Sequence, residues 1–331
     1  MTRPTLDTTA ETETSPRWSL RLPGGRELAL GGRPLVLGIV NVTPDSFSDG
    51  GLWLDPERAV GHALALAGEG ADLLDLGAES TRPAGAAYGA GAEPVSADEE
   101  WRRLGPVLDR LRPATRLPIS VDTRTGEVAR RALAAGADLV NDVSALADPA
   151  LAEAVAEAGC PVVLMHSRGT TATMREHARY DDVAAEVRAE LAAALARAEA
   201  AGIDRQQTVL DPGIGFAKVG RQNLELLARL PELAELGRPL LVGASRKSFL
   251  GELTGRPPAE RLAGSLAAAL WAAARGAAIL RVHDVRDTVG ALAVWAGLEV
   301  AGIASPSAAG LNGAGAGSAA AAGADAAGAM R

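Results

Sequence analysis

A regular alternation of short apolar runs with longer helical patterns most constrains the fold of this 331-residue chain. Each run is rich in Leu, Val and Ile and ends near Asn, Asp, Gly or Pro, which is typical of a buried strand followed by a turn. Strands that alternate with helices form a parallel sheet, and eight such units close into a barrel. The sequence therefore predicts an α/β fold, a single (β/α)8 TIM barrel. The expected strands are 35–40, 72–76, 117–121, 138–141, 161–165, 208–210, 239–242 and 278–282.

The segments between these runs carry the helical pattern. Several of them end in a phrase such as Ala-Gly-Ala-Asp at 135–138. In this phrase Gly supplies the left-handed cap of the helix before the next strand begins, so the repeat is structural. The expected helices are 56–69, 98–112, 126–135, 149–158, 180–201, 223–230, 258–275 and 285–296.

The two ends of the chain lie outside this alternation. Residues 18–33 alternate apolar and polar side chains around Pro23-Gly24-Gly25. That pattern predicts a β-hairpin, which we expect to plug the bottom of the barrel. Residues 1–16 are expected to form a disordered tail, and the Ala/Gly-rich residues 304–331 a flexible one. The catalytic domain is therefore expected over 17–303.

Charge and cysteine content narrow the class of protein. The formal net charge is −8 and no Lys/Arg-rich run occurs, which argues against a nucleic-acid surface. The N-terminus has no apolar core, and no long uncharged apolar stretch follows, so neither a secretory signal nor a membrane span is expected. Cys160 is the only cysteine, and we expect a buried structural thiol. A cytoplasmic protein with small-molecule substrates fits these observations.

Polar and charged side chains gather where the expected strands end. The carboxyl ends of all barrel strands meet on one rim, which is where barrel enzymes place their active sites. Turns favour Asn, Asp and Ser for structural reasons alone, but Lys, Arg and His in the same set indicate a functional site. The strand-end residues are Asn41, Asp75, Asp122, Asn141, Asp142, Met165, His166, Asp211, Lys247, Arg281 and His283.

Eight phrases at these positions resemble those of the dihydropteroate synthases, the pterin-binding enzymes of folate synthesis. The first is Asn-Val-Thr-Pro-Asp-Ser-Phe-Ser-Asp-Gly-Gly at 41–51 (loop one), and the second is Asp-Leu-Gly-Ala-Glu-Ser-Thr-Arg-Pro at 75–83 (loop two). The resemblance extends over residues 34–298. The other phrases are Ser-Val-Asp-Thr at 120–123, Asn-Asp-Val at 141–143, Leu-Met-His at 164–166, Asp-Pro-Gly-Ile-Gly-Phe-Ala-Lys at 211–218, Gly-Ala-Ser-Arg-Lys-Ser-Phe at 243–249 and Arg-Val-His-Asp-Val at 281–285.

The resemblance implies the condensation of 6-hydroxymethyl-7,8-dihydropterin diphosphate with p-aminobenzoate, giving 7,8-dihydropteroate and diphosphate. It implies that Asp211 accepts the amino-pyrimidinone edge of the pterin, because a carboxylate can accept two parallel N–H donors. Lys247 would contact the ring carbonyl, and Arg281 would lie against the ring face. The implied pterin site is Asp122, Asn141, Val143, Met165, Asp211, Lys247 and Arg281.

The resemblance also implies a site for the diphosphate leaving group. Arg281 and His283 are two residues apart on a strand, so their side chains share a face, and barrel phosphate sites commonly lie near the last strands. Asn41 offers an amide oxygen to Mg²⁺, a hard ion that keeps several waters. The implied diphosphate site is Asn41, Thr81, Arg281 and His283, with Arg281, His283 and Lys247 as catalytic residues and Asn41 as the metal ligand.

A second pocket for p-aminobenzoate is implied beside the first. Ser248 and the helix that starts after Lys247 offer a hydroxyl and backbone amides to a carboxylate. The resemblance adds Phe216 and three residues of loop two, Thr81, Arg82 and Pro83. No protein nucleophile is implied, and loops one and two are expected to close as a lid. A homodimer and a sulfonamide target are also implied.

The chain departs from the family pattern in loop two and at three single positions. Residues 84–92 insert about seven small residues, which adds reach at a modest entropic cost. Ala78 and Ala217 stand where Gly is frequent, and Gln222 stands where His is often found. None of these departures deletes a charged group of the implied site.

Two alternatives stay open at this point. A non-catalytic or altered-specificity paralogue would keep the barrel and bind a pterin, but the presence of Thr81, Arg82, Lys247 and Ser248 favours catalysis. A pterin-dependent methyltransferase domain would lack the Ser-Thr-Arg-Pro and Ser-Arg-Lys-Ser phrases, and both occur here.

Overall fold

Eight parallel strands close into a barrel in the computed structural model, which describes residues 17–42, 56–77, 95–170 and 172–301. Neighbouring strands pair in chain order, and β10 closes the ring by pairing with both β9 and β3. The predicted barrel is confirmed. The strands are β3 (Leu35–Asn41), β4 (Leu73–Gly77), β5 (Ile119–Asp122), β6 (Leu139–Asp142), β7 (Val162–Met165), β8 (Thr208–Asp211), β9 (Leu240–Val242) and β10 (Ala277–Val282).

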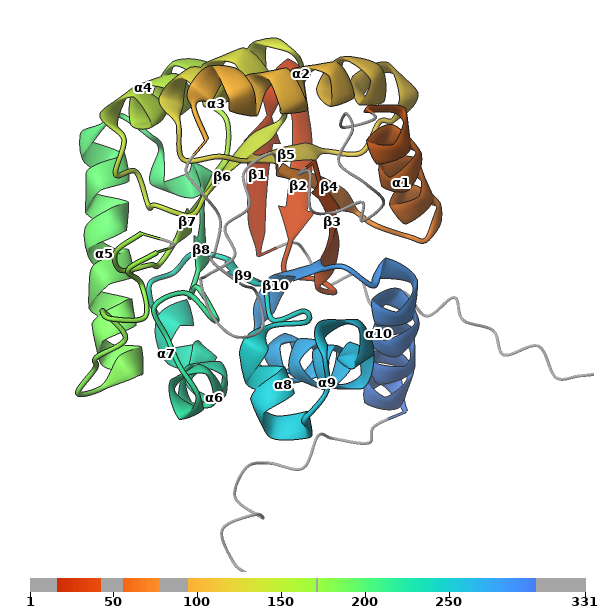
Figure 1. The fold of residues 1–331 in the computed structure, drawn as a ribbon, viewed down its shortest axis with the longest axis vertical. Coiled ribbons are helices and arrows are strands. Elements are labelled where there is room, and N and C mark those ends of the chain that lie inside the picture. The colour runs from red at the N-terminus through yellow and green to blue at the C-terminus, as the bar shows by residue number, and fades with distance from the viewer. Residues whose placement is uncertain (1–16, 43–55, 78–94, 171, 302–331) are drawn as a thin grey trace, which may run out of the picture. The chain divides into compact units, whose positions relative to one another are not determined.

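Helices cover the outside of the barrel, and Figure 1 shows α1 to α9 following one another in chain order around the strands. Helices α2, α4 and α5 begin at polar caps, and in α5 the Asp182 carboxylate accepts hydrogen bonds from the amides of Ala184 and Ala185. Such a cap satisfies amides that have no partner within the helix. The helices are α1 (Pro56–Gly68), α2 (Ala97–Ala114), α3 (Gly126–Ala134), α4 (Pro149–Ala158), α5 (Val183–Ala200), α6 (Arg221–Ala228), α7 (Leu230–Ala234), α8 (Ser248–Thr254), α9 (Leu262–Ala273) and α10 (Val285–Val300).

The helix predicted at 223–230 corresponds to α6, whereas the short α7, which follows a break at Arg229, was not predicted. Pro231 lies in the first turn of α7, lacks an amide hydrogen and cannot bond to the carbonyl of Leu227. That carbonyl instead accepts the indole N–H of Trp271 from α9, at 3.2 Å. Pro231 therefore separates the two helices and leaves the Leu227 carbonyl free to accept the hydrogen bond that links α6 to α9.

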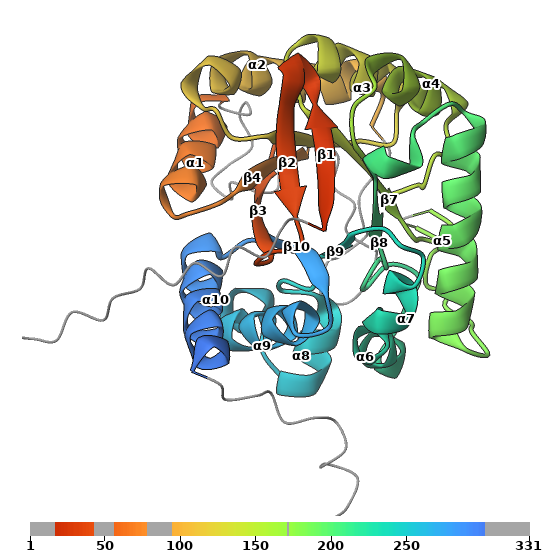
Figure 2. The same ribbon diagram turned by 180° about the vertical axis from the view of Figure 1, so that it is seen from behind.

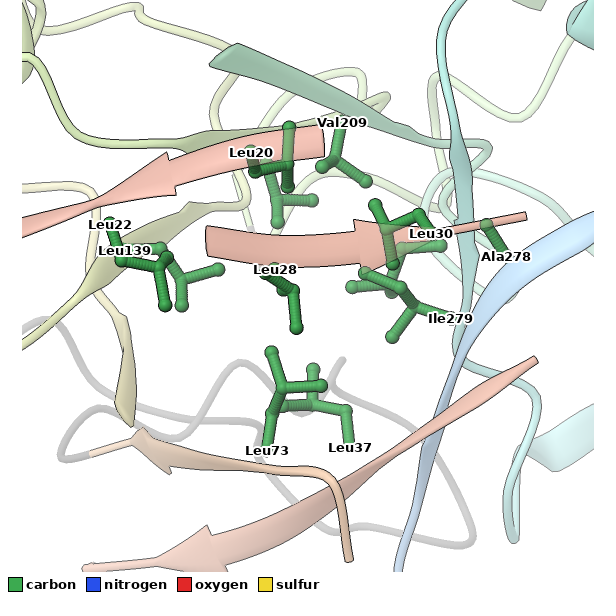
Figure 3. Close-up of a cluster of buried hydrophobic side chains, with 12 residues drawn as sticks. Leu20, Leu22, Leu28, Leu30, Leu37, Leu73, Leu139, Val209, Ala278 and Ile279 are labelled. Carbon is green, nitrogen blue, oxygen red and sulfur yellow. The ribbon is translucent and has the colours of Figure 1, made fainter. Parts of the chain in front are cut away.

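The N-terminal hairpin closes the floor of the barrel. Strands β1 (Trp18–Leu22) and β2 (Arg26–Leu30) pair antiparallel, and Figure 2 shows them in front of the barrel strands. Four leucines of the hairpin pack against apolar side chains at the starts of the barrel strands (Figure 3). The predicted plug is confirmed. The cluster is Leu20, Leu22, Leu28, Leu30, Leu37, Leu73, Leu139, Val163, Val209, Leu241, Ala278 and Ile279.

An ion-pair clamp fastens the hairpin to this floor. Asp138, which is 1% exposed, accepts hydrogen bonds from Arg26 of the hairpin and from Arg112 at the end of α2. Its Oδ2 also accepts the amide of Ile119, at 2.8 Å. A buried carboxylate needs such paired donors to remain charged, so Asp138 is a structural residue far from the rim.

The chain divides into two units, Met1–Leu292 and Ala293–Arg331, of which the first holds the hairpin and the barrel. The tails at 1–16 and 304–331 lie outside the described residues, so the limits of the predicted domain stay predictions. Cys160 is buried, and burial raises the pKa of its thiol to about 12, as expected of a structural thiol. Among the described helices, none is both long enough and apolar enough to cross a membrane.

Candidate active site

The inner faces of the barrel strands carry apolar side chains at the floor and polar side chains nearer the rim. Side chains two residues apart on a strand share a face. Ile279 packs in the floor cluster, so Arg281 follows it on the inner face of β10. In the same way Leu73 of the floor is followed by Asp75 on β4. The sequence alternation therefore builds an apolar floor and a charged upper layer from the same strands.

Arg281 spans the barrel and pairs with two carboxylates. Its Nε lies 2.6 Å from Oδ2 of Asp75 on β4, and its Nη2 lies 2.9 Å from Oδ2 of Asp122 on β5. Asp75 is fully buried, and the Arg281 side chain is 20% exposed. The carboxylates raise the pKa of Arg281 although burial opposes them. From the sequence, Asp75 was placed at a strand end and given no role in the site. In the structure its carboxylate holds the Arg281 guanidinium.

Asp75 also orients an amide of the implied pterin site. Asn141 on β6 donates from Nδ2 to Oδ2 of Asp75, at 3.2 Å. Oδ1 of Asn141 and Oδ1 of Asp75 are buried and have no hydrogen-bond partner among the residues that the structure describes. A buried acceptor without a donor is costly, so both oxygens are suited to N–H donors of a bound molecule.

Asp211 at the end of β8 is a buried carboxylate with a raised pKa. It is 5% exposed, and its Oδ1 accepts the amide of Gly213 at 2.7 Å. Burial raises the pKa of Asp211 to about 6, although the nearby Lys247 and Arg281 favour its ionised form. An acidic group of this kind can accept two N–H donors once it is charged.

Lys247 faces an aromatic ring and the carboxylates. Its Nζ lies 4.1 Å from the ring centre of Phe216, within the range of a cation–π contact. Burial and Arg281 lower the pKa of Lys247 to about 8, and Asp211 and Asp122 oppose this shift. Lys247 caps α8 and Ser248 is its first residue, so both stand at the rim as the sequence predicts.

An apolar wall stands next to these charges. Met165 at the end of β7 packs with Phe216, and Val143 packs against them. The structure thus brings together three side chains that the resemblance assigned to the pterin and p-aminobenzoate sites. Met174 also belongs to this cluster and is 2% exposed. It lies between β7 and α5, where nothing in the sequence distinguished it from a loop residue.

His283 is held neutral beside Arg281. Its Nδ1 lies 3.0 Å from Oγ of Ser245, and its backbone amide donates to the same oxygen. Burial lowers the pKa of His283 to about 3, with Arg246 and Arg281 adding to the effect. Before an anion arrives, His283 is therefore a neutral hydrogen-bonding group. Ser245, which orients it, carried no assignment in the sequence.

Two departures from the family pattern lie between β8 and the first turn of α6. Ala217 adopts the left-handed region with φ of 48°, where a Cβ costs roughly 1 kcal/mol relative to Gly. Gln222 accepts the amide of Val219 at 2.9 Å and donates to the carbonyl of Ala178 at 3.2 Å. The third, Ala78, lies outside the described residues.

Of the remaining predicted site residues, the structure describes Asn41. Asn41 ends β3 and is half-buried. Thr81, Arg82 and Pro83, the insertion at 84–92 and most of loop one lie outside the described residues. Among the described residues, no cluster of three His, Cys, Asp or Glu side chains could hold a metal ion. A single amide oxygen fits Mg²⁺ only if a substrate and water supply the other ligands.

Comparison with known proteins agrees with this geometry. A model of the family described as pterin binding enzyme matches residues 37–283. The dihydropteroate synthase of Escherichia coli (strain K12) is 48% identical over 261 residues, which is 79% of this chain and 90% of that protein.

Solved structures extend the likeness to three dimensions. Xanthomonas albilineans dihydropteroate synthase with 4-aminobenzoic acid is 53% identical and has a TM-score of 0.79, covering 88% of this chain and 100% of that one. The same enzyme in complex with 7,8-dihydropteroate is 50% identical with a TM-score of 0.75, covering 87% of this chain and 100% of that one. The chain therefore belongs to the pterin-binding enzymes and, within them, to the dihydropteroate synthases.

Proposed function

We propose that this chain condenses 6-hydroxymethyl-7,8-dihydropterin diphosphate with p-aminobenzoate, releasing 7,8-dihydropteroate and diphosphate in folate biosynthesis. The observation that carries the proposal is the buried carboxylate of Asp211, which lies beside the apolar wall and near the cations of Lys247 and Arg281. A flat heterocycle with adjacent N–H donors matches that combination.

The pterin would bind on the layer of charges above the floor. Asp211 accepts the amino-pyrimidinone edge, and Asn141 accepts a ring N–H with its free Oδ1. Lys247 donates to the ring carbonyl, and Asp122 contacts the far ring nitrogens. Met165 and Val143 cover one face of the ring, and Arg281 lies against the other.

The diphosphate end would lie toward β3 and β10. Arg281 and His283 donate to its oxygens, and Asn41 and Thr81 complete the proposed diphosphate site. Mg²⁺, held by Asn41 and the substrate oxygens, would neutralise part of the diphosphate charge. His283 enters this contact as a neutral imidazole, since burial lowers the pKa of His283. The approach of an anion would favour its protonated form.

The p-aminobenzoate ring would lie next to Phe216, with its carboxylate at Ser248 and its other side at Thr81, Arg82 and Pro83. The C–O bond between the pterin methylene and the diphosphate breaks, and its electron pair leaves with the diphosphate. The aniline nitrogen then forms the C–N bond and loses a proton to water. The protein contributes positioning, charge stabilisation and exclusion of water.

The assembly and location follow the same family pattern. We propose a cytoplasmic homodimer, and the exposure of Trp271, 44% on α9, supports a contact surface at the late helices. The partners are otherwise small molecules. Sedimentation would test the dimer directly.

Purified protein supplied with the dihydropterin diphosphate, p-aminobenzoate and Mg²⁺ should release diphosphate only when p-aminobenzoate is present. Pterin binding without turnover would instead identify a non-catalytic paralogue. Binding of neither substrate would contradict the assignment of the site.

A further inference from the structure

The loop after β8 carries two of the proposed substrate contacts, Asp211 and Phe216. It ends at Lys218, a lysine that is 4% exposed and to which no role in the reaction has been given. A buried lysine needs partners for its charge. The partners of Lys218 link the two substrate contacts to each other.

Three acceptors surround the Lys218 ammonium. Nζ lies 2.9 Å from Nδ1 of His166, 2.9 Å from the carbonyl oxygen of Phe216 and 3.1 Å from that of Gly213. An ammonium has three N–H donors, and each finds one acceptor here. Burial lowers the pKa of Lys218 to about 7, but three acceptors favour the ammonium over the amine, which has only two donors.

His166 is fixed in the tautomer that this arrangement requires. Its Nε2 lies 3.0 Å from Oε2 of Glu190 on α5, and a carboxylate can only accept, so Nε2 carries the hydrogen. Nδ1 is then bare and accepts from Lys218. Burial lowers the pKa of His166 to about 4, which keeps the ring neutral. Arg168 holds Glu190 in turn, with Nε 2.9 Å from Oε1.

The two carbonyls that Lys218 binds belong to the peptides that set the substrate contacts. The amide of Gly213 donates to the Asp211 carboxylate, and its carbonyl accepts from the amide of Phe216 at 3.0 Å. Gly213 has a φ of 67°, and a Cβ there would lie 1.9 Å from the carbonyl oxygen of His166. The backbone of this loop therefore has little freedom to adopt another conformation that would still place Asp211 and Phe216 where they are.

We infer that Lys218 is a positioning residue that holds the pterin carboxylate Asp211 and the aromatic wall Phe216 in one fixed arrangement, and that His166 and Glu190 hold Lys218. Lys218 acts through the loop and touches neither substrate. The inference rests on the proposed function of the same site. It predicts that loss of the ammonium disturbs both substrates together.

Steady-state kinetics of Lys218→Met test the inference. Methionine keeps much of the side-chain volume and removes the donors. We expect the KM values for both substrates to rise about tenfold or more, and more than kcat falls, because misplaced binding groups weaken ground-state contacts. A merely structural role would lower the thermal midpoint and the active fraction but leave both KM values unchanged. Wild-type KM values, or a rise for one substrate only, would overturn the inference.

A matched pair at His166 decides the question if Lys218→Met does not fold. His166→Asn keeps an oxygen near the place of Nδ1, and His166→Gln keeps a donor near the place of Nε2 but loses that acceptor. We expect the KM values of His166→Asn to stay within about threefold of wild type and those of His166→Gln to rise about tenfold for both substrates. Equal KM values in the two variants would overturn the inference. Absence of turnover in the wild-type protein would show instead that the proposed function has failed, and pterin affinity by calorimetry would then compare the same variants.

Discussion

Arg281 on β10 and Asp75 on β4 form an ion pair across the barrel, with 2.6 Å between Nε and Oδ2. Asp122 binds the other end of the same guanidinium at 2.9 Å. One guanidinium thus pairs with two buried carboxylates before any substrate binds. The geometry of the arginine is fixed in advance, which is the condition for stabilising charge on a leaving group without reorganisation.

Asp75→Ala should destabilise the protein by about 3 kcal/mol, because removing one partner of a buried pair leaves the other charge poorly compensated. Asp75→Asn is the matched control, since it keeps an acceptor for Arg281, and its loss should be smaller. Urea denaturation of the ligand-free protein measures both. Equal unfolding free energies for the two variants and the wild type would show that the pair contributes nothing.

Asp211→Asn should have opposite effects on stability and on binding. Burial raises the pKa of Asp211 to about 6, from 3.8 for an aspartate in the unfolded chain. The favourable contribution of this group is complete below pH 3.8 and is lost as the pH rises through 6, so the ionised form destabilises the fold at pH 7. We expect the variant to gain about 2 kcal/mol of unfolding free energy at pH 7.5.

The same variant should bind the pterin more weakly by about 2–5 kcal/mol, because an amide N–H faces a ligand donor where the carboxylate had accepted. Calorimetric titration at pH 7.5 gives the affinity, and the stability measurement above shows that the fold is intact. Wild-type affinity would place the carboxylate outside the pocket.

His283 should stay neutral between pH 5 and pH 8 in the ligand-free protein, because burial lowers the pKa of His283 to about 3. Its imidazole C2 proton in NMR spectra should therefore not shift over this range. The protein unfolded in urea supplies the reference titration near 6.5. Added diphosphate should raise the pKa, and a ligand-free transition near 6.5 would contradict the burial argument.

Removal of divalent cations with a chelator should suppress diphosphate release, and excess Mg²⁺ should restore it. Asn41→Ala should raise the Mg²⁺ concentration needed for half-maximal activity by roughly tenfold, because an amide oxygen of the coordination shell is lost. Asn41→Asp keeps an oxygen and should need less Mg²⁺ than Asn41→Ala. Full activity in the chelator would show that the reaction needs no metal.

Leu30→Ala should destabilise the protein by about 3 kcal/mol and leave kcat/KM unchanged. Leu30 is 1% exposed in the floor cluster, so its loss leaves a cavity. Leu64→Ala on α1 is the control, since Leu64 is 37% exposed and its truncation should change stability by less than about 1 kcal/mol. A changed kcat/KM in Leu30→Ala would mean that the floor influences the rim.

The barrel could be predicted from the sequence because its signal is local and repeated. Each strand has its own apolar run and its own turn, so eight independent observations agree on one fold. The hairpin was predictable for the same reason, from alternation around Pro23-Gly24-Gly25. The short α7 was missed because the predicted helix ends at Leu230, just before Pro231, whereas this proline lies in the first turn of a new helix.

The strand-end residues of the site could be predicted because a barrel brings them to one rim. Their pairing could not, since Asp75 meets Arg281 only after the ring closes between β10 and β3. The protonation state of His283 could not be predicted for a related reason. Burial determines the pKa of His283, and burial is known only once the molecule has packed. The buried contacts of Lys218 likewise depend on His166, which is distant in sequence.

The hairpin at the floor affects the route by which substrates could reach the charged layer of the barrel. Leu20 and Leu30 are 0% and 1% exposed, so packed side chains fill the floor beneath the hairpin. Asp122 and Asp211 are 7% and 5% exposed and are therefore more buried than Ser248, which is half-buried at the rim. In the proposed function, a pterin bound at Asp122 and Asp211 would therefore enter before p-aminobenzoate reaches Ser248, and it would leave after p-aminobenzoate. The hairpin, which carries none of the proposed substrate contacts, would thus influence the order in which the substrates bind.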